Sequence, residues 1–95
     1  MRVRFTKNAI GHVHQIECDT LDAFGPKVAR EFLARIDRAA QSVAAFPLSG
    51  RAGRVKDTRE LMVPNTPFLI AYRIVKNEIH ILAVLHGARR WPAIL

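Results

Sequence analysis

The sequence of 95 residues is poor in cysteine and has no long apolar run. Its single cysteine, Cys18, excludes an intrachain disulfide and a cysteine-based zinc cluster, and it suits a reducing compartment. No stretch approaches the roughly 18 apolar residues that cross a bilayer, and the basic N-terminus is not followed by an apolar run of signal-peptide length. The four histidines lack metal-ligand spacing. We therefore expect a cytosolic protein without a metal or other cofactor.

Aromatic residues are also scarce, at 7%, and acidic residues are outnumbered by 15 Lys and Arg to 8 Asp and Glu. The formal charge of +7 favours an anionic target or an acidic partner without saying which. Few side chains offer a platform for stacking bases, so a small basic nucleic-acid-binding module is the weakest alternative. The 49% of hydrophobic residues is too high for a disordered chain, and the length predicts one domain over residues 1–95.

The first half of the chain predicts one strand and two helices. Residues 2–5 alternate polar and apolar side chains, as in a strand with one buried face. Thr6 or Asn8 then caps a helix, and Gly25-Pro26 ends it and begins a second helix that runs from Lys27 to about Ala45. The apolar stripe expected on the first helix comprises Ile10, Val13, Ile16 and residues 21–24. The stripe expected on the second comprises Val28, Phe32, Ile36, Ala39 and Val43.

The second half predicts a basic loop followed by three strands. Pro47, Gly50 and Gly53 mark the loop, and the strands cover residues 58–63, 68–75 and 78–86. The short connections, including a tight turn at Lys76-Asn77, require antiparallel neighbours. The fold class is therefore α+β: an N-terminal strand, a helical hairpin, and a three-stranded antiparallel segment that completes one sheet.

The last two predicted strands are largely apolar on both faces. Two helices cover only one face of a sheet, so the second face is covered either by the chain's own ends or by a partner. Exposed apolar patches mark interaction sites. We therefore favour a partner macromolecule on the second face.

Three ordered segments resemble the RelE/ParE toxin superfamily: residues 53–61, residues 63–73 and residues 84–92. The resemblance spans nearly the whole chain. It implies the toxin of a bacterial type II toxin-antitoxin module, which inhibits growth and forms a hetero-oligomer with a cognate antitoxin that neutralises it.

Members of this superfamily differ in their target. RelE-like toxins cut mRNA in the ribosome, which requires a general base, a general acid and cations on the phosphate. For ParE-like toxins, the resemblance implies inhibition of DNA gyrase and the absence of the nuclease residues. This chain has Leu69 where nuclease subfamilies commonly carry arginine, and it lacks their C-terminal tyrosine. The leading hypothesis is a ParE-like, non-catalytic gyrase inhibitor, and the alternative is a ribosome-dependent mRNA endonuclease.

The two hypotheses use different residues. As a nuclease, the chain is expected to act through Arg59, Arg73, His86 and Arg89. The residues expected to contact the target or the antitoxin are Arg51, Arg54, Lys56, Leu69, Leu82, Val84, Arg90 and Trp91. Structural roles compete with these: Arg59 and Glu60 form surface ion pairs, Tyr72 lies in the core with its hydroxyl at the edge, and Trp91 anchors the tail by packing.

Overall fold

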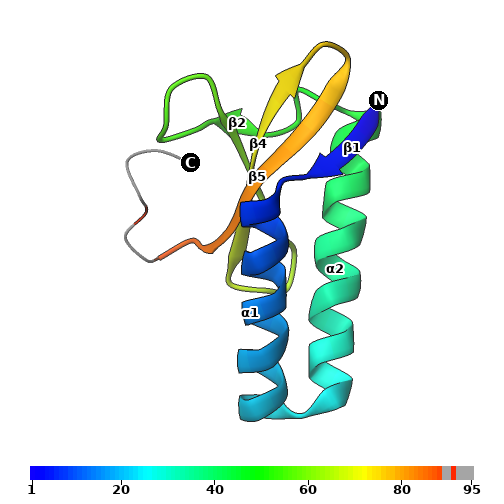
Figure 1. Ribbon diagram of the computed structural model, residues 1–95, viewed down its shortest axis with the longest axis vertical. Coiled ribbons are helices and arrows are strands. Elements are labelled where there is room, and N and C mark those ends of the chain that lie inside the picture. The colour runs from blue at the N-terminus through cyan, green and yellow to red at the C-terminus, as the bar shows by residue number, and fades with distance from the viewer. Residues whose placement is uncertain (89–90, 92–95) are drawn as a thin grey trace.

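The structure is a computed structural model that describes residues 1–88 and Trp91, and it packs two helices against one face of a five-stranded sheet (Figure 1). In chain order the elements are β1 (Arg2–Phe5), α1 (Lys7–Phe24), α2 (Pro26–Ala45), β2 (Arg51–Ala52), β3 (Arg59–Met62), β4 (Phe68–Val75) and β5 (Glu78–His86). The strand order is β1-β5-β4-β3-β2. Only the β1–β5 pair is parallel among these strands.

This architecture confirms the predicted α+β fold and its element order. One element was not predicted, namely the two-residue strand β2. It lies inside the predicted loop and pairs with Arg59 and Glu60 of β3. Neither helix in the described part of the chain is long and apolar enough to cross a membrane.

Local signals in the sequence set the helix ends. The Thr6 hydroxyl accepts a hydrogen bond from the Ala9 N–H at 3.2 Å, so Thr6 is the cap of α1. Gly25 joins the helices with φ at 88°, a left-handed conformation that a residue with Cβ rarely adopts, and its N–H donates to the Leu21 carbonyl. The tight turn at Lys76 and Asn77 also follows the prediction, because both residues have positive φ, as a two-residue hairpin turn requires.

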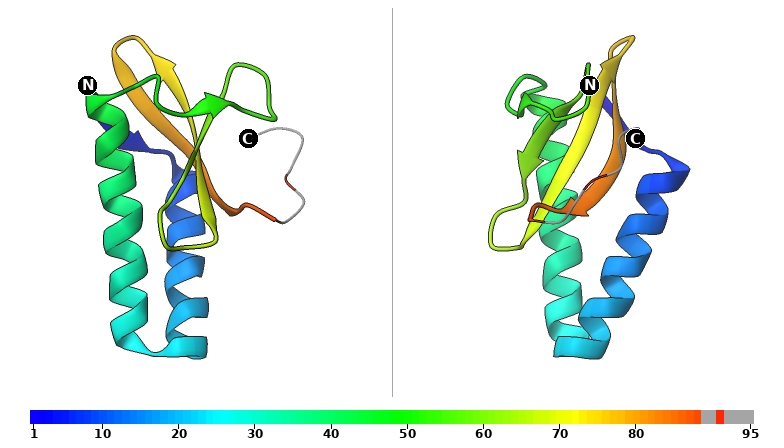
Figure 2. Two further views of the ribbon diagram at one scale, coloured as in Figure 1. Left: turned by 180° about the vertical axis from the view of Figure 1, so that it is seen from behind. Right: turned by 90° about the vertical axis from the view of Figure 1, so that its left-hand side faces the viewer.

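The buried stripes of the two helices differ from those that the sequence predicts. On α1 the buried residues are Ala9, Ile16 and Thr20, whereas Ile10, Leu21 and Phe24 are exposed. Leu21 and Phe24 lie in the distal part of the hairpin, which extends beyond the sheet (Figure 2). The predicted stripe is correct only at Val13 and Ile16, because Ala9 and Thr20 are buried in place of its two ends, and sequence alone does not show where the sheet ends. On α2 the predicted Ile36, Ala39 and Val43 are buried, together with Ala29 and Ala40, whereas the predicted Val28 and Phe32 are only half-buried.

The face of the sheet away from the helices, the outer face, is closed at its centre. Leu69, Ala71 and Ala83 on this face are 1%, 0% and 0% exposed. The connection between β2 and β3 reaches across to the end of β5, where the Arg54 guanidinium donates to the Gly87 carbonyl at 3.1 Å. The favoured expectation, that a partner covers the outer face, was therefore wrong at its centre, which the chain itself buries.

The predicted binding role of three apolar residues does not fit this packing. Leu69, Leu82 and Val84 are at most 9% exposed, so they offer almost no surface to a partner. Val84 belongs to the core beneath the helices. Leu82 is the extra residue of a β-bulge, because Ala83 pairs with Ala71 and Ile81 pairs with Tyr72.

Candidate functional site

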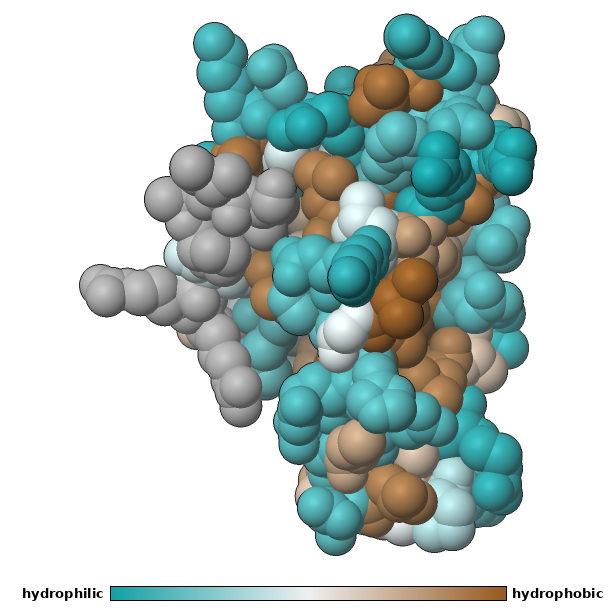
Figure 3. Space-filling view, viewed as in Figure 1, coloured by the Kyte–Doolittle hydropathy of each residue, from teal (hydrophilic) through white to brown (hydrophobic). Residues whose placement is uncertain are grey.

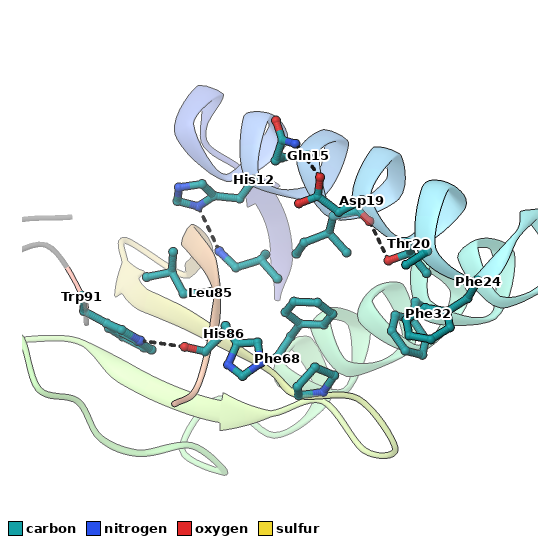
Figure 4. A pocket seen from close by; sticks show the side chains of 14 residues that line it. His12, Gln15, Asp19, Thr20, Phe24, Phe32, Phe68, Leu85, His86 and Trp91 are labelled. Carbon is teal, nitrogen blue, oxygen red and sulfur yellow. Dashed lines mark hydrogen bonds between the residues drawn. The ribbon is translucent and has the colours of Figure 1, made fainter. Parts of the chain in front are cut away.

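An open groove of about 380 Å³ lies between α1 and the ends of β4 and β5. Figure 4 shows side chains from α1, α2, β4 and β5 converging on it, with aromatic rings at both ends. We call it the α1 groove. Its lining residues are His12, Gln15, Ile16, Asp19, Thr20, Ala23, Phe24, Phe32, Pro67, Phe68, Val84, Leu85, His86 and Trp91.

His12 joins α1 to the free edge of β5 at one end of this groove. Strand β1 stops at Phe5, so β5 has no strand partner beyond Ile81 on that side. The Val84 N–H instead donates to His12 Nδ1 at 3.2 Å. This bond requires an unprotonated Nδ1, and partial burial lowers the pKa of His12 below its usual value. The imidazole therefore serves as a neutral acceptor that replaces a neighbouring strand.

Aromatic contacts build the floor and far side of the groove. The Phe68 ring packs edge-on against both Phe32 and His86, with centroids 6.0 Å apart in each pair. The Trp91 indole N–H donates to the His86 carbonyl at 3.3 Å. Phe24 at the tip of α1 is 68% exposed, so it forms an apolar edge that the fold leaves uncovered.

A second groove of about 300 Å³ separates α2 from β3. Arg35 and Arg38 line it beside the apolar side chains of Leu61 and Met62. Arg35 is partly engaged, because its guanidinium donates to the Asn65 carbonyl at 3.2 Å and lies 3.9 Å from the Glu31 carboxylate. This groove therefore combines a cationic wall with an apolar floor.

Glu60 holds the basic loop in place. Its side chain is only 1% exposed, and its carboxylate accepts from the Arg54 backbone N–H at 2.7 Å and from the Arg51 guanidinium at 3.3 Å. The Arg54 guanidinium also lies 4.0 Å above the Trp91 ring. Glu60 therefore forms ion pairs, as expected, but the expectation that they lie on the surface was wrong for its carboxylate, because the loop folds back over β3 and buries it.

Tyr72 and Arg59 hold the turn that precedes this loop. The Tyr72 hydroxyl donates to the Pro47 carbonyl at 2.8 Å and accepts from the Gly50 N–H at 2.9 Å. The Arg59 guanidinium donates to the Gly50 carbonyl at 2.7 Å. Gly50 is required here, because an added Cβ would lie 2.6 Å from the Tyr72 oxygen. The predicted core role of Tyr72 agrees with its 0% exposure.

The predicted nuclease residues within the described part of the chain do not converge. Arg59 pairs with Tyr72 on the helix side of the sheet, whereas Arg73 pairs with His80 on the outer face. His86 lies six residues along β5 from His80, which is the partner of Arg73. At about 3.3 Å per residue, this places His86 roughly 20 Å from that partner. Its Nδ1 accepts from the Ala88 N–H at 3.2 Å.

The remaining predicted residues are placed as follows. Arg51 and Arg54 are bound to Glu60, Lys56 is exposed, and Trp91 contacts Arg54 and His86. Arg89 and Arg90 lie outside the described residues. The packing predicted for Trp91 fits its contacts.

Charge is distributed unevenly over the fold. Between Lys7 and Ala45, five basic and five acidic residues cancel, so the whole net charge of +7 comes from β1 and the residues after the hairpin. Figure 3 shows apolar residues reaching the surface along the hairpin and at its lower tip, while hydrophilic residues dominate the upper end near the β4–β5 turn. The helical hairpin is therefore neutral overall, and the excess positive charge belongs to the rest of the sequence.

Sequence reasoning missed the roles of His12 and Glu60. Both act by accepting hydrogen bonds from backbone N–H groups that are distant in the sequence. The only local signal was that each polar residue adjoins an apolar stripe. Within the described residues, no three His, Cys, Asp or Glu side chains are grouped to hold a metal ion.

Known proteins resemble the chain over most of its length. The family model described as the ParE toxin of a type II toxin-antitoxin system, parDE, matches residues 3–91. A candidate toxin, Y4kP of Sinorhizobium fredii, is 37% identical over 94 residues, covering 99% of this chain and 96% of that protein. Toxin RelE2 of Caulobacter vibrioides is 31% identical over 71 residues, covering 75% of this chain and 78% of that protein.

The fold also matches a solved structure. A chain from the chromosomal ParDE toxin-antitoxin system of P. aeruginosa superimposes with a TM-score of 0.83, covering 90% of this chain and 95% of that chain. The two sequences are 24% identical, so this likeness concerns the fold.

Proposed function

The chain belongs to the ParE toxin family of type II toxin-antitoxin systems, and from this premise we propose that it inhibits growth by binding DNA gyrase without cutting nucleic acid. The observation that carries the proposal is the separation of Arg59, Arg73 and His86 over two faces of the sheet. A phosphoryl-transfer site needs its acid, base and cations around one phosphate. Leu69, where a nuclease commonly has arginine, is a buried apolar residue. We propose that the toxin acts in the cytoplasm, where bacterial gyrase works.

A supercoiling assay tests the gyrase proposal. Purified toxin is incubated with gyrase, ATP and relaxed plasmid, and the products are separated on a gel with and without detergent. The expected result is blocked supercoiling or a trapped, cleaved plasmid. The control is the same toxin mixed beforehand with the product of the neighbouring reading frame. Undiminished supercoiling at a large excess of toxin would remove gyrase as the target.

We further propose that a cognate antitoxin neutralises the toxin by placing an apolar segment in the α1 groove. The groove is open and its lining is largely apolar, and Phe24, which is 68% exposed, extends this apolar surface at the edge of the groove. Excess positive charge on the sheet favours an acidic segment beside the apolar one. The outer face is not used for this contact, because its centre is already closed.

Two matched variants test the antitoxin surface. Phe24→Asp places a charge at the groove edge, whereas Phe46→Asp changes a residue of equal exposure, 69%, at the far end of α2. Calorimetry with the product of the neighbouring reading frame is expected to show weaker binding, by about tenfold or more, for Phe24→Asp alone. Equal affinities for the two variants would place the antitoxin elsewhere.

The alternative is a ribosome-dependent mRNA endonuclease. It is favoured by one observation, the 31% identity to a protein named Toxin RelE2. The assay is cleavage of message in programmed ribosomes, with His86→Ala beside the unmodified toxin. Message cut by the unmodified toxin and left intact by His86→Ala would establish this alternative in place of gyrase binding.

A further inference from the structure

A row of basic side chains crosses three strands on the outer face. Arg4 of β1 pairs with His80 of β5, and Arg73 of β4 pairs with the same His80. Their neighbours Ile79 and Tyr72 belong to the core under the helices, so the three side chains lie on the opposite face. We call Arg4, His80 and Arg73 the cationic row.

One carboxylate lies among these side chains. Glu78 accepts from His80 Nε2 at 3.1 Å and lies 3.8 Å from the Arg4 guanidinium and 4.0 Å from that of Arg2. The hydrogen bond from His80, followed by the charges of Arg4 and Arg2, lowers the pKa of Glu78 despite some desolvation. Two arginines share this single charge, and exposed Lys76 at the hairpin turn adds another cation, so this end of the sheet stays positive.

At the other end of the row, the positive charge of Arg73 is offset less by acidic groups. The Arg73 Nε donates to the Asp57 carbonyl at 3.4 Å, which is a backbone acceptor without formal charge. The Asp57 carboxylate is offset by its exposed neighbour Lys56. Within the described residues, no ion pair joins Arg73 to an acidic side chain.

We propose that the cationic row binds the phosphate backbone of duplex DNA. Neighbouring strands are about 4.8 Å apart, so Arg4 and Arg73 are separated by roughly 10 Å. A DNA duplex carries about one charge per 1.7 Å of its axis, so a row of this length faces several phosphates. The choice of DNA rests on the proposed function, because gyrase acts on duplex DNA.

Two features favour a duplex over other anions. Binding of a single strand relies on large aromatic platforms, and the row contains no Phe, Tyr or Trp. An acidic peptide gains most of its affinity from buried anchors, whereas Arg2 and Glu78, which adjoin the row on this face, are charged, and Val75 beside them is already half-buried. A surface on which arginines outnumber carboxylates suits a regular backbone of phosphates.

Fluorescence anisotropy with a labelled duplex of random sequence tests the proposal. Arg4→Gln/Arg73→Gln removes two cations from the row, and Arg30→Gln/Arg38→Gln removes two exposed cations from α2. Both double variants lose the same formal charge. The row variant is expected to bind one to two orders of magnitude more weakly at about 50 mM salt, with the slope of log affinity against log salt reduced by about 1.8. The α2 variant is expected to bind as the unmodified chain does.

Further arms make the result decisive. Arg4→Lys/Arg73→Lys keeps both charges and is expected to retain binding, and melting curves verify that each variant folds. Equal losses in the row and α2 variants, or no binding by the unmodified chain, would overturn the proposal. So would binding of a single strand, an RNA duplex or polyglutamate at least as tight as that of duplex DNA. The anisotropy measurement contains no gyrase, so its outcome is independent of the supercoiling assay.

Discussion

Replacing Tyr72 with phenylalanine removes one oxygen atom from the centre of the molecule and little else. The hydroxyl makes two hydrogen bonds, to the Pro47 carbonyl and from the Gly50 N–H, and the residue is 0% exposed. Each neutral bond contributes about 0.5 to 1.5 kcal/mol net, and the Gly50 N–H loses its partner in a buried position. We expect a loss of about 1 to 3 kcal/mol in the free energy of unfolding.

Urea unfolding followed by circular dichroism measures this loss. A small domain has a total stability of about 5 to 15 kcal/mol, so the shift in midpoint is readily measured. In thermal melting, 2 kcal/mol corresponds to a decrease of roughly 8 to 16 °C in Tm for a domain of this size.

Ser42→Ala is the matched control for loss of a hydroxyl. Its hydroxyl donates to the Ala39 carbonyl within α2, and the residue is exposed, so we expect a change within about 0.5 kcal/mol. A Tyr72→Phe effect no larger than that of Ser42→Ala would refute the argument that the hydroxyl holds the turn before the basic loop.

Three further predictions concern the basic loop, the α1 groove and the turn between β4 and β5. Glu60→Gln keeps the shape of the side chain but removes its charge, so backbone amides of residues 53–58 should exchange hydrogen faster; unchanged exchange by mass spectrometry would contradict the role of the carboxylate. His12 has a lowered pKa in the folded state, so the unfolded chain takes up its proton at higher pH, and stability should fall as pH decreases through the ordinary value of 6.5. His12→Gln should flatten this part of the profile of urea midpoints, and parallel profiles would count against it. Asn77 has φ at 63°, so Asn77→Ala should cost about 1 kcal/mol in thermal melting while Asn77→Gly costs nothing; equal melting of the two variants would show that the turn is not strained.

Much of the fold was predictable because its signals are local. The Thr6 cap, the Gly25-Pro26 break and the Lys76-Asn77 turn each depend on the conformational preferences of one or two residues. The apolar runs at residues 68–75 and 78–86, bounded by turn residues, likewise require only neighbours along the chain. These features bound the helices and strands, and short connections between the strands then leave few ways to arrange them.

The candidate site was less predictable, because its contacts join residues that are distant in the sequence. Arg59, Arg73 and His86 appear as one set when only residue types are considered, and the strand register separates them.

The sequence by itself determined the order of the elements, the positive charge and the likeness to a toxin family, since each follows from residue identity and spacing. Tertiary structure alone decided which charged side chains lie close together and which apolar residues are exposed to solvent. Pairing across β1, β5 and β4 brings Arg4, His80 and Arg73 into one row, and the folded loop buries Glu60. The hairpin extends past the sheet and leaves Phe24 uncovered, because exposure depends on where neighbouring elements end.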